Sequence, residues 1–320
     1  MIGFRLRFHA LESEEGGVMG LVSMMKLLAD AQRDGYAVCY CESWNLESFQ
    51  GTLEAAEEAE SPIIMGFNGG FLNHPGRAKP ENLVSWGGMV SVLRAAKVPV
   101  AFILNETDDL EQIESGVELG FNAVMVENHN LSLDEYRQLV KKVVALAHTR
   151  DVAVEAQIGH LGEGVAGAES KGDATDPLLA KNFAAETGID ALSVSVGNVH
   201  IATARKSAVD LEVLRRIHEA VQVPLVIHGG TGFPLEQARD AIGLGVAKVN
   251  FGTGLKQAYL AALREKLQAY HEPLSPHPFL GMGGKDDILV GSREAVKREV
   301  KVLLQAFGSV GKAKGMKSAA

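Results

Sequence analysis

The sequence predicts an α/β fold, specifically a (β/α)8 TIM barrel with extra C-terminal helices. From Met19 onward, helical and strand patterns alternate with few long breaks. The strand-like runs number eight, and a helical pattern lies between each pair. Eight alternating βα units over about 250 residues favour a closed barrel over an open doubly wound sheet.

The elements follow from short apolar runs and from apolar residues at helical spacing. Strands are expected at residues 37–41, 62–67, 99–104, 123–126, 152–158, 191–196, 224–227 and 247–251. Helices are expected at residues 21–32, 46–60, 83–96, 110–119, 133–148, 177–187, 211–221 and 234–244, and after the barrel at 259–270 and 293–307. We expect one domain over residues 1–320, with the barrel at about 19–265, a C-terminal helical extension at about 266–310 and a flexible tail at 311–320.

Composition excludes several classes of protein. The 320 residues are 46% hydrophobic and 22% charged, and their net charge of −9 argues against a nucleic-acid binder, which needs a basic surface. The sequence has no apolar stretch of 18 residues and no basic segment before an apolar run at its start, so we expect neither membrane spanning nor secretion, and a cytoplasmic location. Cys39 and Cys41 stand two apart, a spacing that suits buried strand residues better than a disulfide or zinc motif.

The stretch from Val223 to Gly254 carries the strongest chemical signal. Two predicted strands end in polar, glycine-rich clusters, His228 to Gly232 and Asn250 to Gly254. Parallel α/β folds place ligand sites at such strand ends. The glycines let backbone N–H groups approach an anion closely, and threonine hydroxyls add donors, so we expect a phosphate cradle. The alternative is that the glycines only form tight turns.

A second glycine-rich segment, residues 159–175, is polar and has no periodicity. It follows a predicted strand, which makes it a candidate mobile loop over the active-site face. The alternative is a disordered connector.

In order and spacing, several segments resemble the class II, metal-dependent fructose- and tagatose-bisphosphate aldolase family. They begin with LVSMMKLLADAQRDGYAV, are strongest over SVSVGNVH, PLVIHGGTG and LGVAKVNFGTGL, and end with LLQAFGSVGKA. The resemblance implies the same barrel fold, a homodimer or homotetramer, and a small-molecule sugar phosphate as partner, with no nucleic acid or membrane.

The resemblance also implies one divalent metal ion, usually zinc, held by three histidines, of which two correspond to His200 and His228. As a Lewis acid on the ketose carbonyl, the metal would stabilise the enediolate formed when the adjacent carbon–carbon bond breaks. Phosphate binding is implied at Gly197, Gly229, Gly230, Thr231, Asn250 and Thr253. Lys206 lies near the family's phosphate lysine, although a solvated loop charge is the favoured interpretation.

The sequence departs from the family at the first ligand and its neighbour. Where the family has His-Leu-Asp-His, this chain has Ile103 to Glu106, so Asn105 takes the place of the catalytic aspartate and Glu106 that of the ligand histidine. A carboxylate can bind zinc at the same distance as imidazole, and it moves the preference toward manganese or another oxygen-binding ion. An amide, however, cannot transfer a proton as a carboxyl group does.

Other acidic positions are rearranged as well. Glu42 replaces the asparagine of the family's second strand, Glu127 an aspartate, and Gln157 the second glutamate of a Glu-x-Glu pair that leaves Glu155. The family's loop glutamate would fall near Val165, with Glu163 and Glu169 close by. We expect Asn105, Glu42 and Glu127 as the catalytic candidates; the alternative for the two glutamates is that they are solvated loop carboxylates.

Three functions remain open. The first is a metal-dependent aldolase, a carbon–carbon lyase that cleaves a phosphorylated ketose into dihydroxyacetone phosphate and an aldehyde, or condenses them. The second is an isomerase or epimerase of a sugar phosphate or sugar acid on the same scaffold, which Asn105 favours because it lacks a transferable proton. The third is a non-catalytic paralogue that binds a sugar phosphate.

Overall fold

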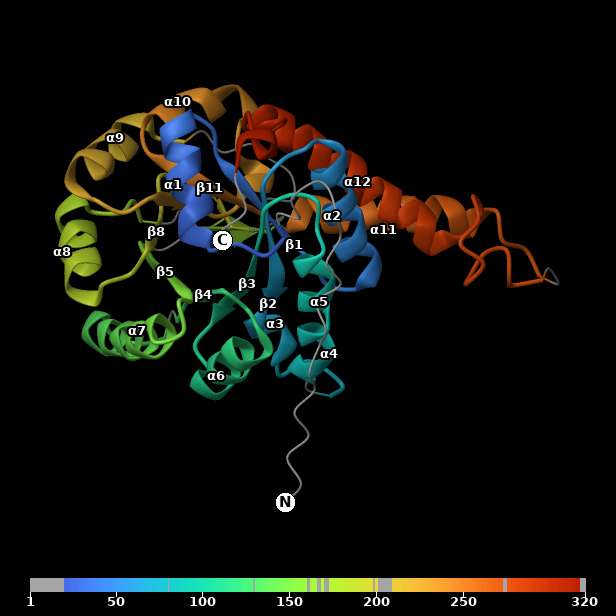
Figure 1. Cartoon of the computed structure of the whole chain (residues 1–320), viewed down its shortest axis with the longest axis horizontal. Coiled ribbons are helices and arrows are strands. Elements are labelled where there is room, and N and C mark those ends of the chain that lie inside the picture. Colours follow the sequence, from blue (N-terminus) through green and yellow to red (C-terminus); the bar gives the residue numbers. More distant parts are fainter. Residues whose placement is uncertain are drawn as a thin grey trace, which may run out of the picture.

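A computed structural model describes residues 20–79, 81–128, 130–159, 162–165, 168–169, 173–197, 199–200, 209–272 and 275–316. Within these ranges, eight parallel strands close into a barrel in the order β1-β11-β10-β8-β5-β4-β3-β2 (Figure 1). They are β1 (Val38–Glu42), β2 (Ile63–Asn68), β3 (Val100–Thr107), β4 (Ala123–Val126), β5 (Ala153–Ile158), β8 (Ala191–Val194), β10 (Leu225–Ile227) and β11 (Val246–Phe251). The predicted (β/α)8 barrel and all eight expected strands are therefore confirmed, and both cysteines are buried in β1.

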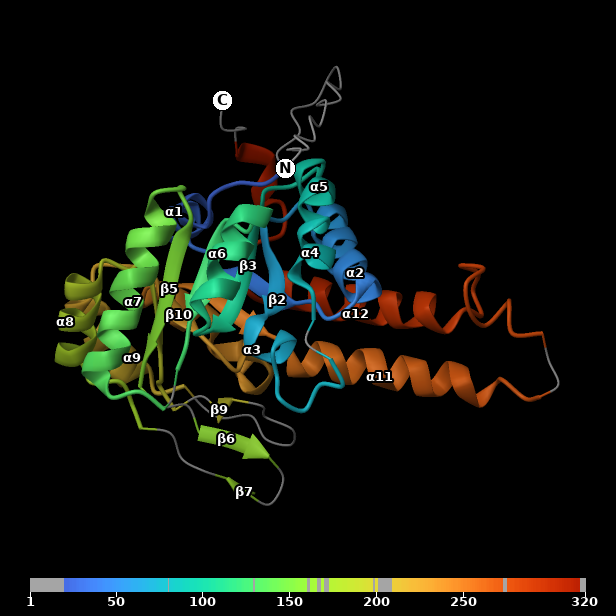
Figure 2. The same ribbon diagram turned by 90° about the horizontal axis from the view of Figure 1, so that it is seen from below.

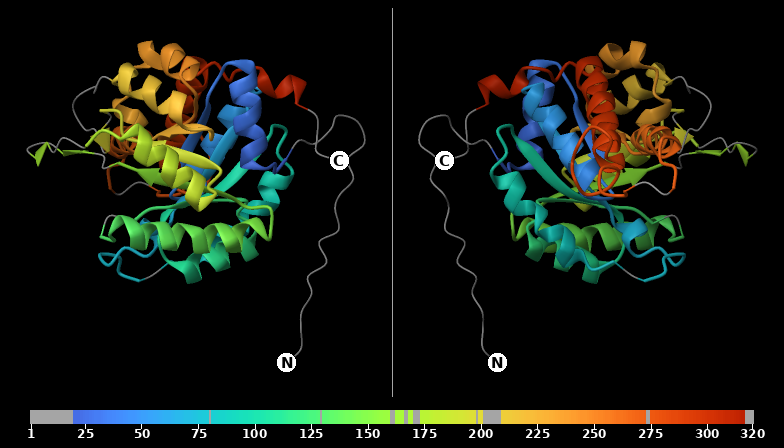
Figure 3. Two further views of the ribbon diagram at one scale, coloured as in Figure 1. Left: turned by 90° about the vertical axis from the view of Figure 1, so that its left-hand side faces the viewer. Right: turned by 90° about the vertical axis from the view of Figure 1, so that its right-hand side faces the viewer.

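The helices surround the barrel (Figure 3). They are α1 (Met24–Asp34), α2 (Leu46–Glu58), α3 (Gly69–Leu72), α4 (Leu83–Gly87), α5 (Met89–Arg94), α6 (Leu110–Leu119), α7 (Leu133–His148), α8 (Pro177–Thr187), α9 (Leu211–Ala220), α10 (Ala238–Gly243), α11 (Thr253–Gln268) and α12 (Ile288–Ala306), with short 3₁₀ turns η1 (Gly230–Gly232), η2 (Leu235–Gln237) and η3 (Lys312–Gly315). None of these described helices is both long and apolar enough to cross a membrane.

Four helices differ clearly from the sequence-based expectation. The helix expected at 293–307 begins five residues earlier, at Ile288. The helix expected at 83–96 is two short helices, α4 and α5, that meet at Gly88, where a helix loses stability because glycine is flexible. The helix expected at 234–244 is α-helical only over α10, after the 3₁₀ turn η2. The helix expected at 259–270 begins six residues earlier, at Thr253, directly after the barrel strand β11.

The barrel interior is narrow and mostly apolar. Small side chains such as Ala101, Ala123, Ala153 and Ala191 fill it, and buried residues of α1 pack on the same cluster. Because successive strand residues point to opposite faces, a strand that buries one residue inside the barrel returns to the interior two residues later. In this way β1 carries Tyr40 and then Glu42 on the interior face, and Glu42 is the last residue of the strand.

The two C-terminal helices α11 and α12 run side by side and extend away from the barrel (Figures 1 and 2). Helix α12 packs on α2, where Val296, Val300 and Leu304 are buried. Residues 311–316, at the start of the expected flexible tail, lie against the end of α2: the backbone N–H groups of Gly311 and Ala313 donate to the carbonyls of Ala59 and Glu60. Residues 317–320 lie outside the described residues.

A small sheet stands off the barrel at the carboxyl end of β5 (Figures 2 and 3). It joins β6 (Gly162–Val165) with β7 (Ala168–Glu169) and, in parallel, with β9 (Val199–His200), in the order β7-β6-β9. The pairing places the backbone of Glu163 opposite that of His200. The described part of the glycine-rich segment 159–175 is therefore not a wholly irregular loop but contains strands that pair with the segment carrying His200.

Candidate functional site

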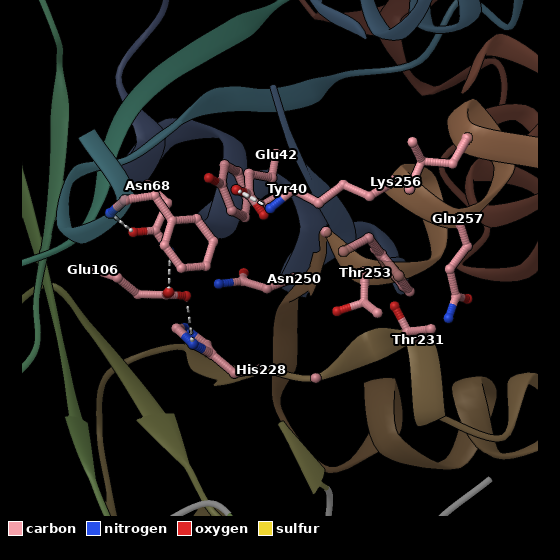
Figure 4. A pocket seen from close by; sticks show the side chains of 15 residues that line it. Tyr40, Glu42, Asn68, Glu106, His228, Thr231, Asn250, Thr253, Lys256 and Gln257 are labelled. Carbon is pink, nitrogen blue, oxygen red and sulfur yellow. Dashed lines mark hydrogen bonds and ion pairs between the residues drawn. The ribbon is translucent and has the colours of Figure 1, made fainter. Parts of the chain in front are cut away.

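A cavity of about 360 Å³ opens at the carboxyl ends of the barrel strands (Figure 4). Its wall combines side chains that follow or end β1, β2, β3, β10 and β11 with the first turns of α11. The described residues that line it are Tyr40, Glu42, Asn68, Phe71, Glu106, His228, Gly229, Thr231, Asn250, Phe251, Gly252, Thr253, Lys256, Gln257 and Leu260. The two polar clusters expected from the sequence therefore meet in one cavity.

Glu106 lies at an irregular point of β3. The pairing of β3 with β4 shifts register between Leu104 and Thr107, and Glu106 adopts a φ of +53°. A residue other than glycine in this conformation costs about 1–3 kcal/mol, a cost found mostly at functional sites. The distortion turns the Glu106 carboxylate into the cavity, where the amides of Asn105 and Asn68 donate to its two oxygens. Burial, with the nearby charge of Glu127, raises the pKa of Glu106.

Behind the cavity, His228 belongs to a buried chain of charged groups. Its Nε2 lies 2.9 Å from Oε1 of Glu155, and Nζ of Lys248 donates to the other oxygen of Glu155 at 2.7 Å. None of the three residues is exposed. Burial alone would raise the pKa of Glu155, but Lys248 and His228 outweigh it and lower that pKa. Glu155 is therefore an ionised acceptor, which favours a proton on Nε2 of His228 and fixes the orientation of the ring.

The Nδ1 atom of His228 faces Glu106, 3.5 Å from its Oε1 (Figure 4). A tetrahedral zinc ion with bonds of about 2.0–2.2 Å separates two ligand atoms by about 3.3–3.6 Å, so this pair fits two adjacent ligand positions. No group of three or more His, Cys, Asp or Glu side chains within the described part of the chain forms a complete metal cluster. The side chain of His200, the third expected ligand, lies outside the described residues, as does Lys206.

The expected anion cradle lies on the other side of the cavity. The Thr231 hydroxyl accepts the backbone N–H of Gly254 at 2.9 Å and so ties the loop after β10 to the start of α11. Thr253 is the first residue of that helix, whose N-terminus favours negative charge. The Asn250 side chain is only 6% exposed and points into the cavity, yet neither its nitrogen nor its oxygen has a hydrogen-bond partner among the described residues.

Two of the expected phosphate-binding glycines do not line this cavity. Gly197 is exposed with a φ of +86°, and Gly230 is buried behind the wall. A Cβ atom at Gly230 would come within 2.5 Å of the Phe251 ring and 2.6 Å of the Asn250 carbonyl oxygen. Gly230 is therefore required for close packing of the two loops, whereas Gly229, Thr231, Asn250 and Thr253 border the cavity itself.

The three catalytic candidates are not gathered in one place. Glu42 borders the cavity, where its Oε1 accepts Lys256 Nζ at 2.7 Å. Asn105 is buried and directed at Glu106, with Oδ1 lacking a partner in the described structure. Glu127 lines a neighbouring cavity of about 200 Å³ with Gln157, close enough for its charge to act on Glu106.

Several site residues were not anticipated from the sequence. Lys256 and Gln257 were missed because the helix was expected to begin at residue 259; a start at Thr253 places Lys256 one turn later on the same face. Asn68 follows the strand-end rule that identified His228, since it is the last residue of β2. Lys248 was not singled out, because its partner Glu155 is far away in the sequence.

Comparison with known proteins gives a consistent result. The sequence model of class II fructose-bisphosphate aldolase matches residues 22–312. A fructose-bisphosphate aldolase of Geobacillus stearothermophilus is 34% identical over 304 residues, covering 92% of this chain and 99% of that protein, and one of Thermus caldophilus is 33% identical over 319 residues, covering 92% and 100%. The crystal structure of the YdjI aldolase from Escherichia coli K12 superposes with a TM-score of 0.77 and 30% identity, covering 92% of this chain and 99% of that one.

Proposed function

Because this chain belongs to the class II fructose-bisphosphate aldolase family, we propose that it is a metal-dependent aldolase acting on a phosphorylated ketose. The products of cleavage, or the substrates of condensation, are dihydroxyacetone phosphate and an aldehyde. The observation that carries this proposal is the cavity itself. It places the facing pair of Glu106 and His228 at one side and the cradle around Thr231 and Thr253 at the other, within one space large enough for a small sugar phosphate.

Glu106, His228 and, by resemblance, His200 would hold the divalent ion. Zinc fits this donor set, and the carboxylate also admits manganese or another oxygen-binding ion. When bound, the ion supplies Lewis acidity that polarises the ketose carbonyl and stabilises the enediolate. Glu155 and Lys248 support this role because they orient His228 and favour a proton on its Nε2.

The cradle binds the phosphate and orients the ketose. The hydroxyls of Thr231 and Thr253 and the backbone N–H groups at the start of α11 are suited to a phosphate dianion. The orphaned amide of Asn250 lies between the cradle and the ligand pair, where it can hydrogen-bond a substrate oxygen (Figure 4). The bound ketose then reaches from the cradle, which holds its phosphate group, to the pair of Glu106 and His228, which faces its carbonyl group.

Because Asn105 stands where the family has its catalytic aspartate, another carboxylate must transfer protons in this chain. Among the candidates, Glu42 borders the cavity and is the one we assign to this role, with Glu127 acting from the adjacent cavity. Asn105 does not line the cavity but holds Glu106 in place through its Nδ2.

A specific observation favours the second function, an isomerase or epimerase of a sugar phosphate or sugar acid. Asn105 cannot protonate an aldehyde oxygen, and its amide is already engaged by Glu106. An isomerase still needs a stabilised enediolate but no group for the aldehyde. The third function, binding without catalysis, requires only the cradle.

Incubation of the metal-loaded protein with dihydroxyacetone phosphate in heavy water separates these functions. An aldolase exchanges a proton at the carbon next to the carbonyl and then forms a carbon–carbon bond when an aldehyde is added. Exchange with interconversion of ketose phosphates, but without bond formation, identifies an isomerase or epimerase. Absence of exchange with any ketose phosphate, in protein that retains no divalent ion, leaves the binding function.

The double replacement Asn105→Asp with Glu106→His provides a sharper comparison. If the unmodified protein cleaves fructose bisphosphate, the replacements should change the rate but not the type of reaction. If cleavage appears only in the double variant, the natural reaction of this chain lies elsewhere.

A further inference from the structure

Lys256 extends from the second turn of α11 across the cavity. Its Nζ donates to Oε1 of Glu42 at 2.7 Å, and it lies 4.6 Å from the centre of the Phe71 ring and 5.8 Å from that of Trp44. The side chain is 32% exposed, so its ammonium group is held in place and still reaches the open space. These contacts fix a positive charge above the cavity rather than leaving it on a flexible stem.

The positive charge of Lys256 offsets negative charge on the cavity wall and so favours an anionic substrate. Glu42 places a carboxylate on its wall that would repel an anionic substrate, whereas the carboxylate of Glu106 faces the proposed metal ion. Among the described residues of the wall, Lys256 is the one lysine or arginine. A second feature points to a ligand in the same space: the buried amide of Asn250 has no hydrogen-bond partner in the described structure.

Resting on the proposed function, we propose that Lys256 is a specificity-determining residue that binds the phosphate group of the substrate, and that Glu42 holds its ammonium group in place until the phosphate arrives. Lys256 follows Thr253 by three residues, so both side chains leave the same face of α11. The ammonium group and the cradle of Thr231 and Thr253 therefore approach one phosphate from two sides, which selects phosphate esters over neutral sugars.

The carboxylate of Glu42 competes with the substrate phosphate for the ammonium group of Lys256. Removing the charge of Glu42 should therefore strengthen phosphate binding if Lys256 is a phosphate ligand. If Lys256 only supports the position of Glu42, the same change should leave phosphate binding unaltered.

Titration calorimetry of the full-length, metal-loaded protein with inorganic phosphate at low salt tests this, with acetate as the carboxylate probe. Lys256→Met keeps the apolar stem on the aromatic rings but removes the charge, and should weaken phosphate binding at least about tenfold. Glu42→Gln should strengthen it by several-fold. Lys301→Met, on the outer helix α12, is the matched control and should bind phosphate as the unmodified protein does.

The proposal is overturned if the unmodified protein binds no phosphate, if Lys256→Met binds it as tightly as the control, if Glu42→Gln fails to tighten it, or if acetate binds as tightly as phosphate. Hydrogen exchange of dihydroxyacetone phosphate, measured on the same samples, keeps the two proposals apart. Phosphate binding that depends on Lys256 without exchange contradicts only the aldolase function. Exchange with an unchanged KM in Lys256→Met contradicts only the role of Lys256.

Discussion

Lys248 Nζ lies 2.7 Å from Oε2 of Glu155 inside the barrel, where neither side chain is exposed. Burial lowers the pKa of Lys248 while Glu155 opposes that change, and Lys248 in turn keeps Glu155 ionised. Nζ also lies 5.0 Å from the centre of the Tyr40 ring. The ion pair thus holds His228 in its position in the site, because the other oxygen of Glu155 contacts His228.

Replacement of Lys248 by Met should therefore destabilise the protein strongly. It leaves the Glu155 carboxylate buried without its main counter-charge, which costs about 3–5 kcal/mol. Denaturant unfolding of Lys248→Met measures the loss. The double variant Lys248→Met with Glu155→Met removes both charges and should recover most of the stability. If the double variant is no more stable than Lys248→Met alone, the unpaired charge of Glu155 is not the cause of the lost stability.

Metal content should depend on Glu106, His228 and Glu155 to different degrees. Glu106→Gln and His228→Asn remove proposed ligands and should release the ion. Glu155→Gln loosens the orientation of His228 and also removes the counter-charge of Lys248, so in the folded fraction it should weaken metal affinity about 10- to 100-fold. Elemental analysis after dialysis and competition with a chelator give both quantities. The exposed His148, which contacts Asp190, supplies the control His148→Asn. Retention of a full complement of metal by Glu106→Gln would exclude Glu106 as a ligand.

The eight strands could be predicted because each is a short apolar run between helical segments, and His228 and Asn250 because polar residues at strand ends face one barrel mouth. The partners of these residues could not. Glu155 and Lys248 lie 93 residues apart, and their contact depends on strand register, which no local pattern encodes. Lys256 was missed for a related reason: the start of α11 at Thr253 follows from its direct attachment to β11, not from its own amphipathic pattern. The positive φ of Glu106 arises from a shift in strand pairing that the letters Asn-Glu do not reveal.

Gly252→Ala should impair the site without unfolding the barrel. A Cβ atom at this position would lie 2.2 Å from Oε2 of Glu42, so the carboxylate must move and its contact with Lys256 must weaken. Because a displaced Glu42 carboxylate no longer reaches the substrate for proton transfer, we expect at least about a tenfold lower kcat/KM with a small change in the unfolding transition. Gly243→Ala is a matched control, because nothing lies within 4 Å of a Cβ there and the residue is helical. Equal activity in both variants would show that the Glu42 position is unimportant.

The projecting pair of helices should mediate self-association into a homodimer or homotetramer. Leu267 on α11 is 48% exposed, and Met282 in the connection to α12 is 69% exposed, on a part of the chain that extends away from the barrel (Figure 1). We interpret these exposed apolar side chains, with Leu280 at 52% exposure in the same connection, as a protein contact surface. Leu267→Glu with Met282→Glu should lower the mass measured by light scattering toward 34.1 kDa, whereas Leu178→Glu, on the exposed face of α8, should not. If the unmodified protein is a monomer, or if Leu178→Glu dissociates the oligomer equally, then α11, α12 and their connection do not hold the subunits together.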